Sequence, residues 1–355
     1  MSAFTPNAQI LLDFTMSEAS ANSFQEMRDI MKRFPGPDEE AMERGKDHEA
    51  ILTKPFGALG HLETLNQWFC AWQGRHPPCL ERPRVAVFAG NHGVTQHHIS
   101  AFPADVTQQM VANFRSGGAA VNQLCKCYDA ELRVYEMALD HFTNDFTESP
   151  ALSESACAGA MAYGMMAVED GVDVICVGEM GIGNTTSAAA LSCALFGGAP
   201  QDWTGTGTGI DKRALERKVA VIRKGLALHR SHLDDPLECL RRLGGHELAA
   251  IAGAVIAARI ARVPVILDGY VATAAAAVLH KIDSTALDHC IIGHLSAEPA
   301  HSMLLDALGK APLLDLNMRL GEASGAVMAL AILKGAVACH IGMASFKEAN
   351  VHEKL

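Results

Sequence analysis

The amino-acid sequence predicts an α/β fold in which a parallel sheet of about six strands is flanked by helices. From residue 84 onward, a short β-branched apolar run, a turn with Gly or Asp and an Ala-rich segment follow one another repeatedly. The long helical connections between these runs imply parallel pairing with right-handed crossovers. Strands buried on both faces read as continuous apolar runs, as VICV, VPVIL and PLLDL do.

The order of the elements follows from the same pattern. Residues 1–50 are polar, charged and helical in pattern, with Pro35, Gly36 and Pro37 as interruptions. From about Gly335 the chain is again helical, and it ends in polar residues. The six predicted strands are Arg84–Ala89, Glu131–Met137, Asp173–Val177, Val263–Leu267, His289–Ile292 and Pro312–Leu316.

The composition limits the possible classes of protein. The chain has 355 residues, which suits one large α/β domain with a helical accessory part, or two modest domains. A hydrophobic content of 49% is ample for a sizeable core. The net charge of -11 argues against a general nucleic-acid binder, because no basic stripe is available to neutralise a phosphate backbone. An anionic substrate would need helix N-termini and a few local cations.

The cysteine and histidine pattern predicts neither disulfides nor metal. Ten cysteines are scattered without a C-x-x-C pair, so we interpret them as small buried apolar residues in a reducing compartment. His97 and His98 are adjacent, but no convergent set of ligands accompanies them. We therefore expect no metal site and no cofactor.

No targeting or membrane segment is predicted. The N-terminus lacks a basic region followed by an apolar stretch. The apolar run Leu248–Leu267 is broken by Arg259 and Arg262, and Ala323–Cys339 carries Lys334 and stops short of a membrane span. We expect a cytoplasmic enzyme.

Glycine and polar residues concentrate directly after the predicted strands. They occupy Gly90–Gly93 after the first strand, Gly178–Thr186 after the third, Asp268–Tyr270 after the fourth, Gly293–Ser296 after the fifth and Asn317–Glu322 after the sixth. In open parallel sheets, ligands bind outside the carboxyl ends of the strands. The pattern predicts an enzyme or a ligand-binding protein with one site built from many loops.

The segment GEMGIGNTT is a glycine-rich turn that opens an Ala-rich helix. Glycines such as Gly181 let the backbone approach a ligand closely, and free N–H groups at a helix start attract phosphate. We favour ligand contact here, with Asn184 and Thr185 as contacts; the alternative is that these two residues or Thr186 only cap the helix. The segment matches neither the P-loop nor the dinucleotide-binding pattern.

The segment TGTGTG is a second glycine-rich loop. A basic helix follows it, and the pattern alone does not decide between a phosphate site and a plain solvated basic face. The loop spans Thr204–Gly209 and includes Gly207, and the cations that follow are Lys212, Arg213, Arg217 and Lys218.

Two carboxylates follow strands three and six. Glu322 precedes a helix of small residues, and Glu179 has the parallel position after the third strand. A carboxylate held against apolar walls has its pKa raised towards a useful general-base value. The alternative for Glu322 is that it only complements the helix dipole.

A polar cluster follows the fifth strand and contains His294, Ser296, Glu298 and His301. A Ser/His nucleophile pair is conceivable, but the nucleophile elbow G-x-S-x-G is absent from the sequence. We favour hydrogen-bonding and positioning roles for these residues.

Taken together, these segments resemble the nicotinate-nucleotide–dimethylbenzimidazole phosphoribosyltransferase family. The resemblance runs from about residue 50 to residue 350. It is carried by HGV…SAFPADVTQQMV…FRSGGAAVNQL, by GEMGIGNTT, by the paired GTGTG and RVPVILDGYVATAAA blocks, and by PLLDLNMRLGEASGA.

The resemblance implies a reaction and an architecture. The reaction converts nicotinate mononucleotide and dimethylbenzimidazole to α-ribazole 5′-phosphate and nicotinate, for the lower ligand of cobalamin. The architecture is a Rossmann-like six-stranded parallel domain, a small helical domain built from both chain ends, and a homodimer whose partner closes the cavity. The corresponding ranges here are 1–60 and 331–355 for the small domain and 61–330 for the catalytic domain.

The resemblance also implies residue roles. Glu322 would be the general base and Glu179 the second carboxylate near the reaction centre. The phosphate would bind to Gly181, Gly207, Lys218 and Ser296. Asp268 and Gly269 would line the nucleotide pocket, and Leu320 and the Phe102 region would form the apolar wall for the aromatic base.

This chain departs from many relatives at two positions. Asn91 stands where Asp is frequent, and Ala300 stands where Gly is usual. We place both at the margin of the pocket, where they bear on base selectivity more than on the reaction.

Two other functions compete with this one. A non-catalytic protein that binds nucleotide or corrinoid precursors would have no evident use for a proton acceptor, which both Glu179 and Glu322 provide. A pyrophosphate-dependent phosphoribosyltransferase of the common type has two adjacent acids after a strand, whereas here Asp268 is followed by Gly269.

Overall fold

The computed structural model describes residues 23–352, and the predicted sheet of six parallel strands is confirmed. The strand order is β2-β1-β3-β4-β5-β6, and every neighbouring pair is parallel. The strands are β1 (Pro83–Ala89), β2 (Glu131–Glu136), β3 (Val174–Met180), β4 (Val265–Leu267), β5 (Cys290–His294) and β6 (Pro312–Leu314). Because β3 extends three residues beyond the predicted end at Val177, Glu179 lies within the strand.

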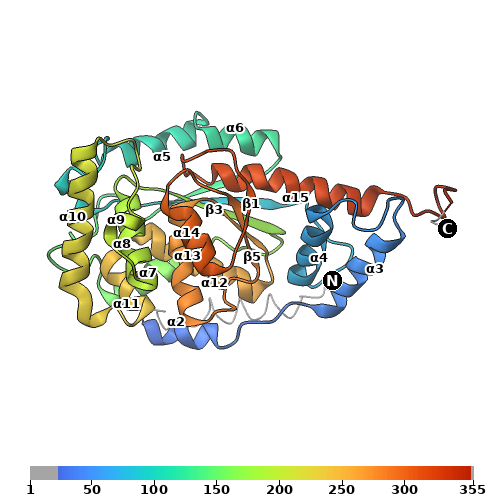
Figure 1. Cartoon of the computed structure of the whole chain (residues 1–355), viewed down its shortest axis with the longest axis horizontal. Coiled ribbons are helices and arrows are strands. Elements are labelled where there is room, and N and C mark those ends of the chain that lie inside the picture. The colour runs from blue at the N-terminus through green and yellow to red at the C-terminus, as the bar shows by residue number, and fades with distance from the viewer. Residues whose placement is uncertain (1–22, 353–355) are drawn as a thin grey trace.

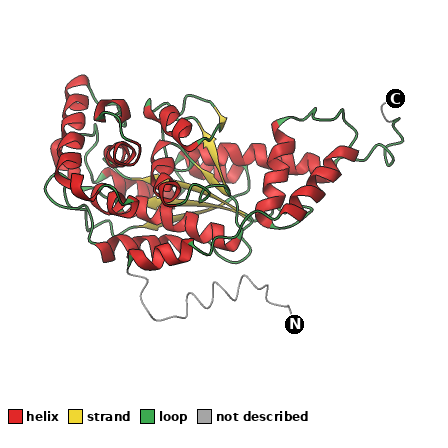
Figure 2. Ribbon diagram, turned by 60° about the horizontal axis from the view of Figure 1, so that its bottom comes forward, coloured by secondary structure: helices red, strands yellow, loops and turns green. Residues whose placement is uncertain are grey.

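Helices cover both faces of this sheet (Figures 1 and 2). In the described residues they are α2 (Phe24–Met31), α3 (Glu39–Ile51), α4 (His61–Gln73), α5 (Val106–Ser116), α6 (Ala120–Cys127), α7 (Glu154–Met165), α8 (Asn184–Phe196), α9 (Pro200–Trp203), α10 (Lys212–His229), α11 (Pro236–Leu243), α12 (His246–Ala261), α13 (Tyr270–Ile282), α14 (Ala300–Leu308) and α15 (Ser324–Gly342). Two short 3₁₀ helices are η1 (Gly93–His97) and η2 (Arg230–His232).

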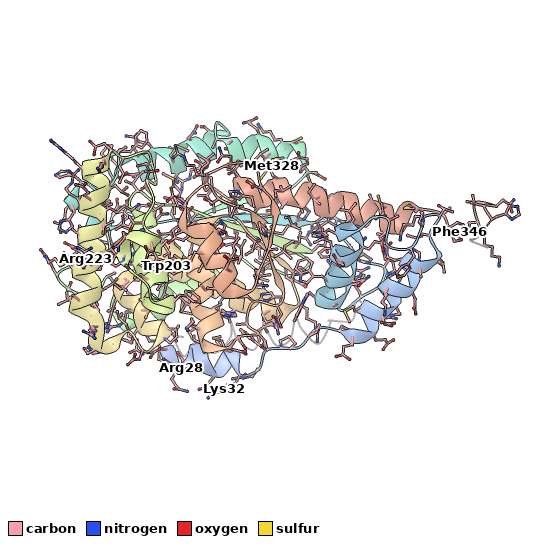
Figure 3. All side chains as sticks on the ribbon, viewed as in Figure 1. Arg28, Lys32, Trp203, Arg223, Met328 and Phe346 are labelled. Carbon is pink, nitrogen blue, oxygen red and sulfur yellow. The ribbon has the colours of Figure 1, made fainter. Side chains whose placement is uncertain are left out.

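The pleat of the strands divides the core into two layers. Along β1, Val85 and Val87 join an apolar cluster with α4, α5, α6 and α15. Ala86 and Phe88, which alternate with them, join the cluster formed with α7, α8, α12 and α13. All four side chains are fully buried, as a parallel strand covered on both faces requires. Figure 3 shows how densely side chains fill the space between sheet and helices.

Helices α3 and α4 and the C-terminal half of α15 lie together at one end of the molecule (Figure 1). Buried polar groups join them: Glu49 on α3 accepts a hydrogen bond from His340 Nδ1 on α15 at 2.6 Å and pairs with Lys54 Nζ at 3.2 Å. By contrast α2 packs against α7, and Arg28 (labelled in Figure 3) pairs with Asp235 at 2.6 Å. The domain boundaries predicted from the sequence stay a prediction, and residues 1–22 of the first range lie outside the described residues.

Helix α15 is longer than the sequence pattern indicated. It spans 19 residues, and by length and composition alone it is long enough and apolar enough to cross a membrane, so the expectation that this stretch stops short of a span was wrong. The difference arises because the helix continues through Gly342 instead of ending near Cys339. Half of its apolar window is buried, and Val327, Leu330 and Leu333 pack on the sheet, as in a core helix.

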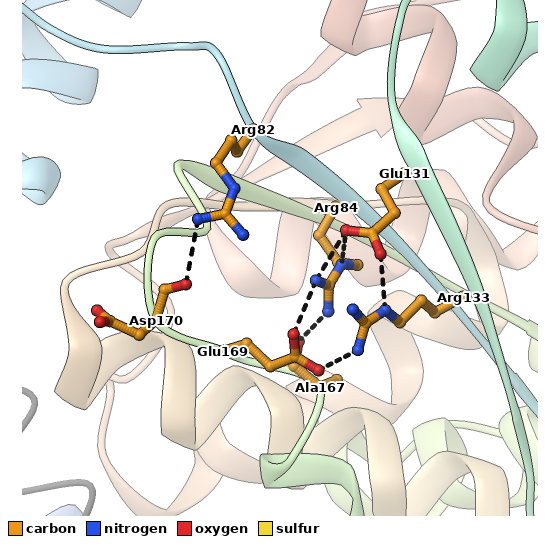
Figure 4. A network of polar contacts seen from close by, with 7 residues as sticks. All are labelled: Arg82, Arg84, Glu131, Arg133, Ala167, Glu169 and Asp170. Atoms are coloured by element: carbon orange, nitrogen blue, oxygen red, sulfur yellow. Dashed lines mark hydrogen bonds and ion pairs between the residues drawn. The ribbon is translucent and has the colours of Figure 1, made fainter.

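A buried arginine ties the amino ends of the strands together (Figure 4). The Arg84 side chain on β1 is 1% exposed and donates to Glu131 Oε2 at 2.9 Å, to Glu169 Oε2 at 3.1 Å and to the Ala167 carbonyl at 3.3 Å. Arg133 pairs with the same two glutamates but is 39% exposed. Arg84 therefore links β1, β2 and the segment between α7 and β3.

This network predicts that Arg84→Ala destabilises the fold far more than Arg133→Ala. Loss of Arg84 removes several charge-assisted hydrogen bonds and leaves a cavity, which together cost about 2–4 kcal/mol. Loss of the exposed Arg133 costs about 0–1 kcal/mol, although it contacts the same glutamates. Urea unfolding of both variants measures the difference in free energy of unfolding, and equal losses would contradict the assignment.

Candidate active site

A cavity of about 420 Å³ opens at the carboxyl ends of the parallel strands. Its lining comes from the loops that follow β1, β3, β4, β5 and β6, together with the TGTGTG loop before α10. The predicted gathering of these strand-end loops around one site is therefore confirmed. The strand order reverses between β1 and β3, which is the position where open α/β sheets bind ligands.

The turn between β6 and α15 lies directly on the end of β3. The backbone N–H of Glu322 donates to the carbonyl of Glu179 at 3.0 Å. Gly321, Glu322 and Ala323 all have positive φ, at 81°, 61° and 59°. A Cβ atom at Gly321 would come within 2.6 Å of Glu179 Oε1, and one at Gly178 within 2.1 Å of the Ala323 nitrogen. Only glycine at both positions permits this approach.

The two predicted catalytic carboxylates both reach the cavity, and both are buried. Burial raises the pKa of Glu322 to about 7. Burial is also the main cause that raises the pKa of Glu179 to about 8, and the nearby acidic groups of Asp268, Glu247 and Glu322 raise it further. Glu322 Oε2 is buried without a hydrogen-bond partner among the described residues. The site thus contains a carboxyl group, that of Glu322, whose pKa suits proton transfer near neutral pH.

The glycine-rich segment after β3 opens α8 with its N-terminus facing the cavity. The N-cap residue is Gly183, which has no side chain to cap the helix, so the alternative of capping by Asn184 or Thr185 was wrong. The Asn184 side-chain amide instead donates to Glu179 Oε2, and Thr185 Oγ1 accepts a 2.8 Å hydrogen bond from Lys218 Nζ. The Asn184 and Thr186 N–H groups donate to the Gly181 and Gly183 carbonyls, and the positive end of the helix dipole at this start favours an anion.

The TGTGTG loop lies beside the start of α8 and forms hydrogen bonds with three other segments of the chain. The Gly207 N–H donates to Glu298 Oε1 at 2.9 Å, and the Gly207 carbonyl accepts from Arg319 Nη1 at 2.8 Å. Thr208 Oγ1 accepts from the Ala101 N–H at 2.9 Å, which ties the loop to the segment after β1. Residues far apart in sequence therefore meet at this one loop.

The polar cluster after β5 forms hydrogen bonds but no nucleophile pair. His301 Nδ1 accepts from the backbone N–H of Ser296 at 2.8 Å, so the ring does not contact the Ser296 hydroxyl through this nitrogen. The Ser296 hydroxyl accepts from the Glu298 N–H at 3.2 Å. Burial lowers the pKa of His301 to about 3, which leaves it neutral. The positioning role is the one that these contacts support.

Ten of the predicted site residues line the cavity. They are Glu179, Glu322, Gly181, Asn184, Thr185, Gly207, Gly269, Ser296, Leu320 and Phe102. Leu320 and Phe102 are 55% and 52% exposed, because they stand at its mouth.

Three predicted residues lie outside the lining. Asn91, which we placed at the margin of the pocket, is buried and donates to the Leu139 carbonyl at 2.9 Å, so it holds the loop after β1. Asp268 is buried beneath the start of α15, where Oδ1 accepts from the Ala326 N–H at 2.9 Å. Lys218 is 1% exposed and reaches the site through its contact with Thr185.

The other departure from the family pattern, Ala300, is also buried. It is the first residue of α14 and is 2% exposed. It lies outside the cavity lining and belongs to the apolar core of the sheet's second face. We therefore find no contact through which it selects a base.

Sequence reasoning missed a buried network behind the GEMGIGNTT segment. His92 Nε2 lies 2.5 Å from Glu247 Oε1, and His92 Nδ1 lies 3.1 Å from Ser187 Oγ. A Cβ at Gly181 would come within 3.0 Å of Glu247 Oε1, so the network supports the loop directly. Glu247 begins a helix that is remote in sequence, and nothing in the local pattern distinguishes it.

Within residues 23–352, no group of three or more His, Cys, Asp or Glu side chains is arranged to hold a metal ion. The site chemistry that the described residues offer is proton transfer by carboxylates, beside an anion site at a helix N-terminus.

The family model described as phosphoribosyltransferase matches residues 34–351. The chain belongs to this phosphoribosyltransferase family. A relative from Rhizobium etli, named nicotinate-nucleotide–dimethylbenzimidazole phosphoribosyltransferase, is 56% identical over 331 residues, which cover 93% of this chain and 98% of the relative. One of the same name from Sinorhizobium medicae is 55% identical over 337 residues, covering 95% of this chain and 99% of the relative.

The fold of this phosphoribosyltransferase agrees with a solved structure. The crystal structure of CobT from Thermus thermophilus has a TM-score of 0.83 and 38% identity, and the match covers 89% of this chain and all of that one. The family and the fold predicted from the sequence are therefore confirmed. The roles of the individual site residues stay predictions.

The buried carboxyl of Glu179 predicts a stability that falls as the pH rises. Its pKa is about 8 in the folded chain against an ordinary value of 4.5, so between these values the folded chain binds a proton that the unfolded chain has released. The stabilisation is complete below about pH 4.5 and is lost as the pH rises through 8. Glu179→Gln removes the titration and should reduce the fall in unfolding free energy between pH 5 and pH 9 by an amount on the order of a few kcal/mol.

Urea unfolding at several pH values measures this effect. Glu216→Gln, the same change at an exposed position on α10, is the matched control and should follow the wild-type profile. A Glu179→Gln profile parallel to that of the wild type would show that Glu179 keeps its ordinary pKa.

Proposed function

We propose that this phosphoribosyltransferase moves the phosphoribosyl group of nicotinate mononucleotide onto 5,6-dimethylbenzimidazole. The products are α-ribazole 5′-phosphate and nicotinate, in the lower-ligand branch of cobalamin biosynthesis. The names of relatives that match almost the whole chain support this substrate pair. The observation that carries the proposal is Glu322, which lines a cavity built from five strand ends and has one carboxyl oxygen buried without a hydrogen-bond partner among the described residues.

The chemistry needs one proton acceptor. The bond between ribose C1′ and the pyridinium nitrogen breaks, and its electron pair returns to the ring nitrogen, so departure needs little acid catalysis. A benzimidazole nitrogen attacks the opposite face of C1′ with its lone pair, which inverts β to α. The other nitrogen of the base then carries an acidic N–H, and Glu322 accepts that proton.

The second carboxylate, Glu179, lies across the turn from Glu322 and is held by the Asn184 amide. In its charged form it stabilises positive charge that develops at C1′ as the pyridinium departs. Its raised pKa makes the charged form a minor one at neutral pH. We therefore include Glu179 in the proposal as the second carboxylate near the reaction centre and not as the primary base.

The phosphate end of the nucleotide belongs at the start of α8. Gly181, Gly207 and Ser296 line this part of the cavity, where the Ser296 hydroxyl is available as a donor and the Gly207 N–H is already bonded to Glu298. Lys218 supports them from behind, because its Nζ donates to Thr185 Oγ1 at 2.8 Å and to the Gly205 carbonyl at 3.1 Å. Gly269 lines the neighbouring wall, and the reaction as written needs no metal and no cofactor.

The aromatic base belongs against Leu320 and Phe102, which stand half exposed at the mouth of the cavity. Such exposed apolar groups beside a site favour further burial, so we include in the proposal a homodimer whose partner closes this end. The ten cysteines are all free, which supports a reducing, cytoplasmic location. A protein that only binds nucleotide has no use for the unpaired Glu322 carboxyl, and this observation disfavours that alternative.

Glu322→Gln should lower the rate of transfer by a factor of ~10²–10⁴, because it preserves size and removes the proton acceptor. The base works in its ionised form, so kcat/KM of the wild-type enzyme should rise as the pH passes through about 7. Product formation from nicotinate mononucleotide and dimethylbenzimidazole, followed by mass spectrometry across pH, measures both effects. Near wild-type transfer by a folded Glu322→Gln variant would disprove the assignment, and Glu216→Gln serves as the exposed control.

Benzimidazole and 5-methylbenzimidazole should be used alongside dimethylbenzimidazole, within roughly a hundredfold in efficiency. Each methyl group in an apolar pocket contributes only about 1–3 kcal/mol of discrimination. Phenols should react far more slowly, since they lack a second ring nitrogen through which to pass a proton to Glu322. Competition between equimolar bases, read out by product mass, tests this expectation. Preferential transfer to phenol, or strict exclusion of benzimidazole, would contradict the pocket assigned to Leu320 and Phe102.

A further inference from the structure

The proposed substrate is an anionic nucleotide, yet the lining of the cavity is rich in carboxyl groups. Glu179, Glu298 and Glu322 all line it. Among the described lining residues, Arg319 is the only Lys or Arg. Lys218 lies behind Thr185 and is almost fully buried, so its ammonium group does not face the cavity directly.

Arg319 is placed to serve the phosphate end of the cavity. It lies on the loop after β6, three residues before Glu322, and its side chain crosses to the TGTGTG loop. There Nη1 donates to the Gly207 carbonyl at 2.8 Å, and this is the only hydrogen bond of the guanidinium within the described part of the chain. A guanidinium has five N–H donors, so most of them remain available to a ligand.

We propose that Arg319 binds the 5′-phosphate of the nucleotide and holds the TGTGTG loop over it. This inference rests on the proposed function, since it assigns a contact to that substrate. A guanidinium matches phosphate oxygens with two parallel N–H donors, and the positive end of the α8 dipole lies beside the loop that Arg319 holds. Arg319 thus becomes the direct cationic contact, and Lys218 becomes the support behind Thr185.

The contact between Arg319 and Gly207 favours the phosphate, and not the nicotinate carboxylate, as the group that Arg319 binds. Its partner Gly207 belongs to the loop that Lys218 and Glu298 also hold, beside the N-terminus of α8. The Gly207 N–H donates to Glu298 and the Gly207 carbonyl accepts from Arg319, so one peptide segment is fixed by an anion and a cation. A phosphate at this position gains the cation and the backbone donors together.

Direct binding measurements without dimethylbenzimidazole test the assignment. Arg319→Gln retains an N–H donor for the Gly207 carbonyl and removes the charge. Arg217→Gln is the matched control, because Arg217 is also exposed and donates to one backbone carbonyl, that of His98, at 3.1 Å, but lies outside the lining. Calorimetric titration with ribose 5-phosphate should show roughly ten- to a hundredfold weaker binding for Arg319→Gln and wild-type binding for Arg217→Gln.

Three analogues identify the group that Arg319 contacts. The loss in affinity should appear with nicotinate mononucleotide and with nicotinamide mononucleotide, which lacks the carboxylate. It should disappear with nicotinate riboside, which lacks the phosphate. A loss that persists with the riboside would show a structural role, and a loss confined to carboxylate-bearing ligands would show carboxylate recognition; either result overturns the proposal.

Unchanged ribose 5-phosphate affinity in Arg319→Gln, or absence of binding by the wild-type protein, would also overturn the proposal. The proposed function fails by a different result, namely the absence of α-ribazole 5′-phosphate when the wild-type protein receives both substrates. Because ribose 5-phosphate binding is measured without turnover, the two failures are distinguishable.

Discussion

The site depends on one close backbone contact, in which the turn between β6 and α15 lies on the end of β3. The Glu322 N–H reaches the Glu179 carbonyl at 3.0 Å only because Gly178 and Gly321 carry no side chain. The same contact brings two carboxyl groups together at the cavity, and both are buried. Their raised pKa values are therefore a direct consequence of backbone packing. Two successive non-glycine residues with positive φ, Glu322 and Ala323, are the strain that this arrangement retains.

The start of α15 transmits this constraint to the rest of the sheet. Asp268 at the end of β4 accepts the Ala326 N–H, and a Cβ at Gly325 would come within 1.8 Å of the His294 ring on β5. The helix start is thus fixed against three strand ends at once. At its other end α15 joins α3 and α4 through His340 and Glu49. The position of the turn between β6 and α15 is in this way tied to helices from both the N-terminal and the C-terminal parts of the chain.

The strands and the loops that line the cavity could be predicted from the sequence, because each is marked by a local pattern of residues. Continuous apolar runs mark the strands, and the loops that follow them mark the cavity. The misplacements have a common cause. Asn91 and Asp268 follow strands as real site residues do, and only the three-dimensional packing shows that their side chains bind the Leu139 carbonyl and the Ala326 N–H instead. Arg319 was not among the predicted site residues, because nothing in the local sequence shows that its side chain reaches Gly207.

Charge is distributed unevenly around the cavity, and this asymmetry defines a direction for the substrate. On one wall stand Glu179 and Glu322, with no cation among the described lining residues beside them except Arg319, whose guanidinium turns away to Gly207. The start of α8 adjoins Glu179 through Asn184, and beyond it lies the TGTGTG loop, which Lys218 supports. Under the proposed function, C1′ and the pyridinium nitrogen of the nucleotide would lie towards the carboxylates, and its phosphate would lie towards the TGTGTG loop. The chain has a net charge of -11, so attraction of an anionic phosphate depends on this local separation of charges and not on the overall charge.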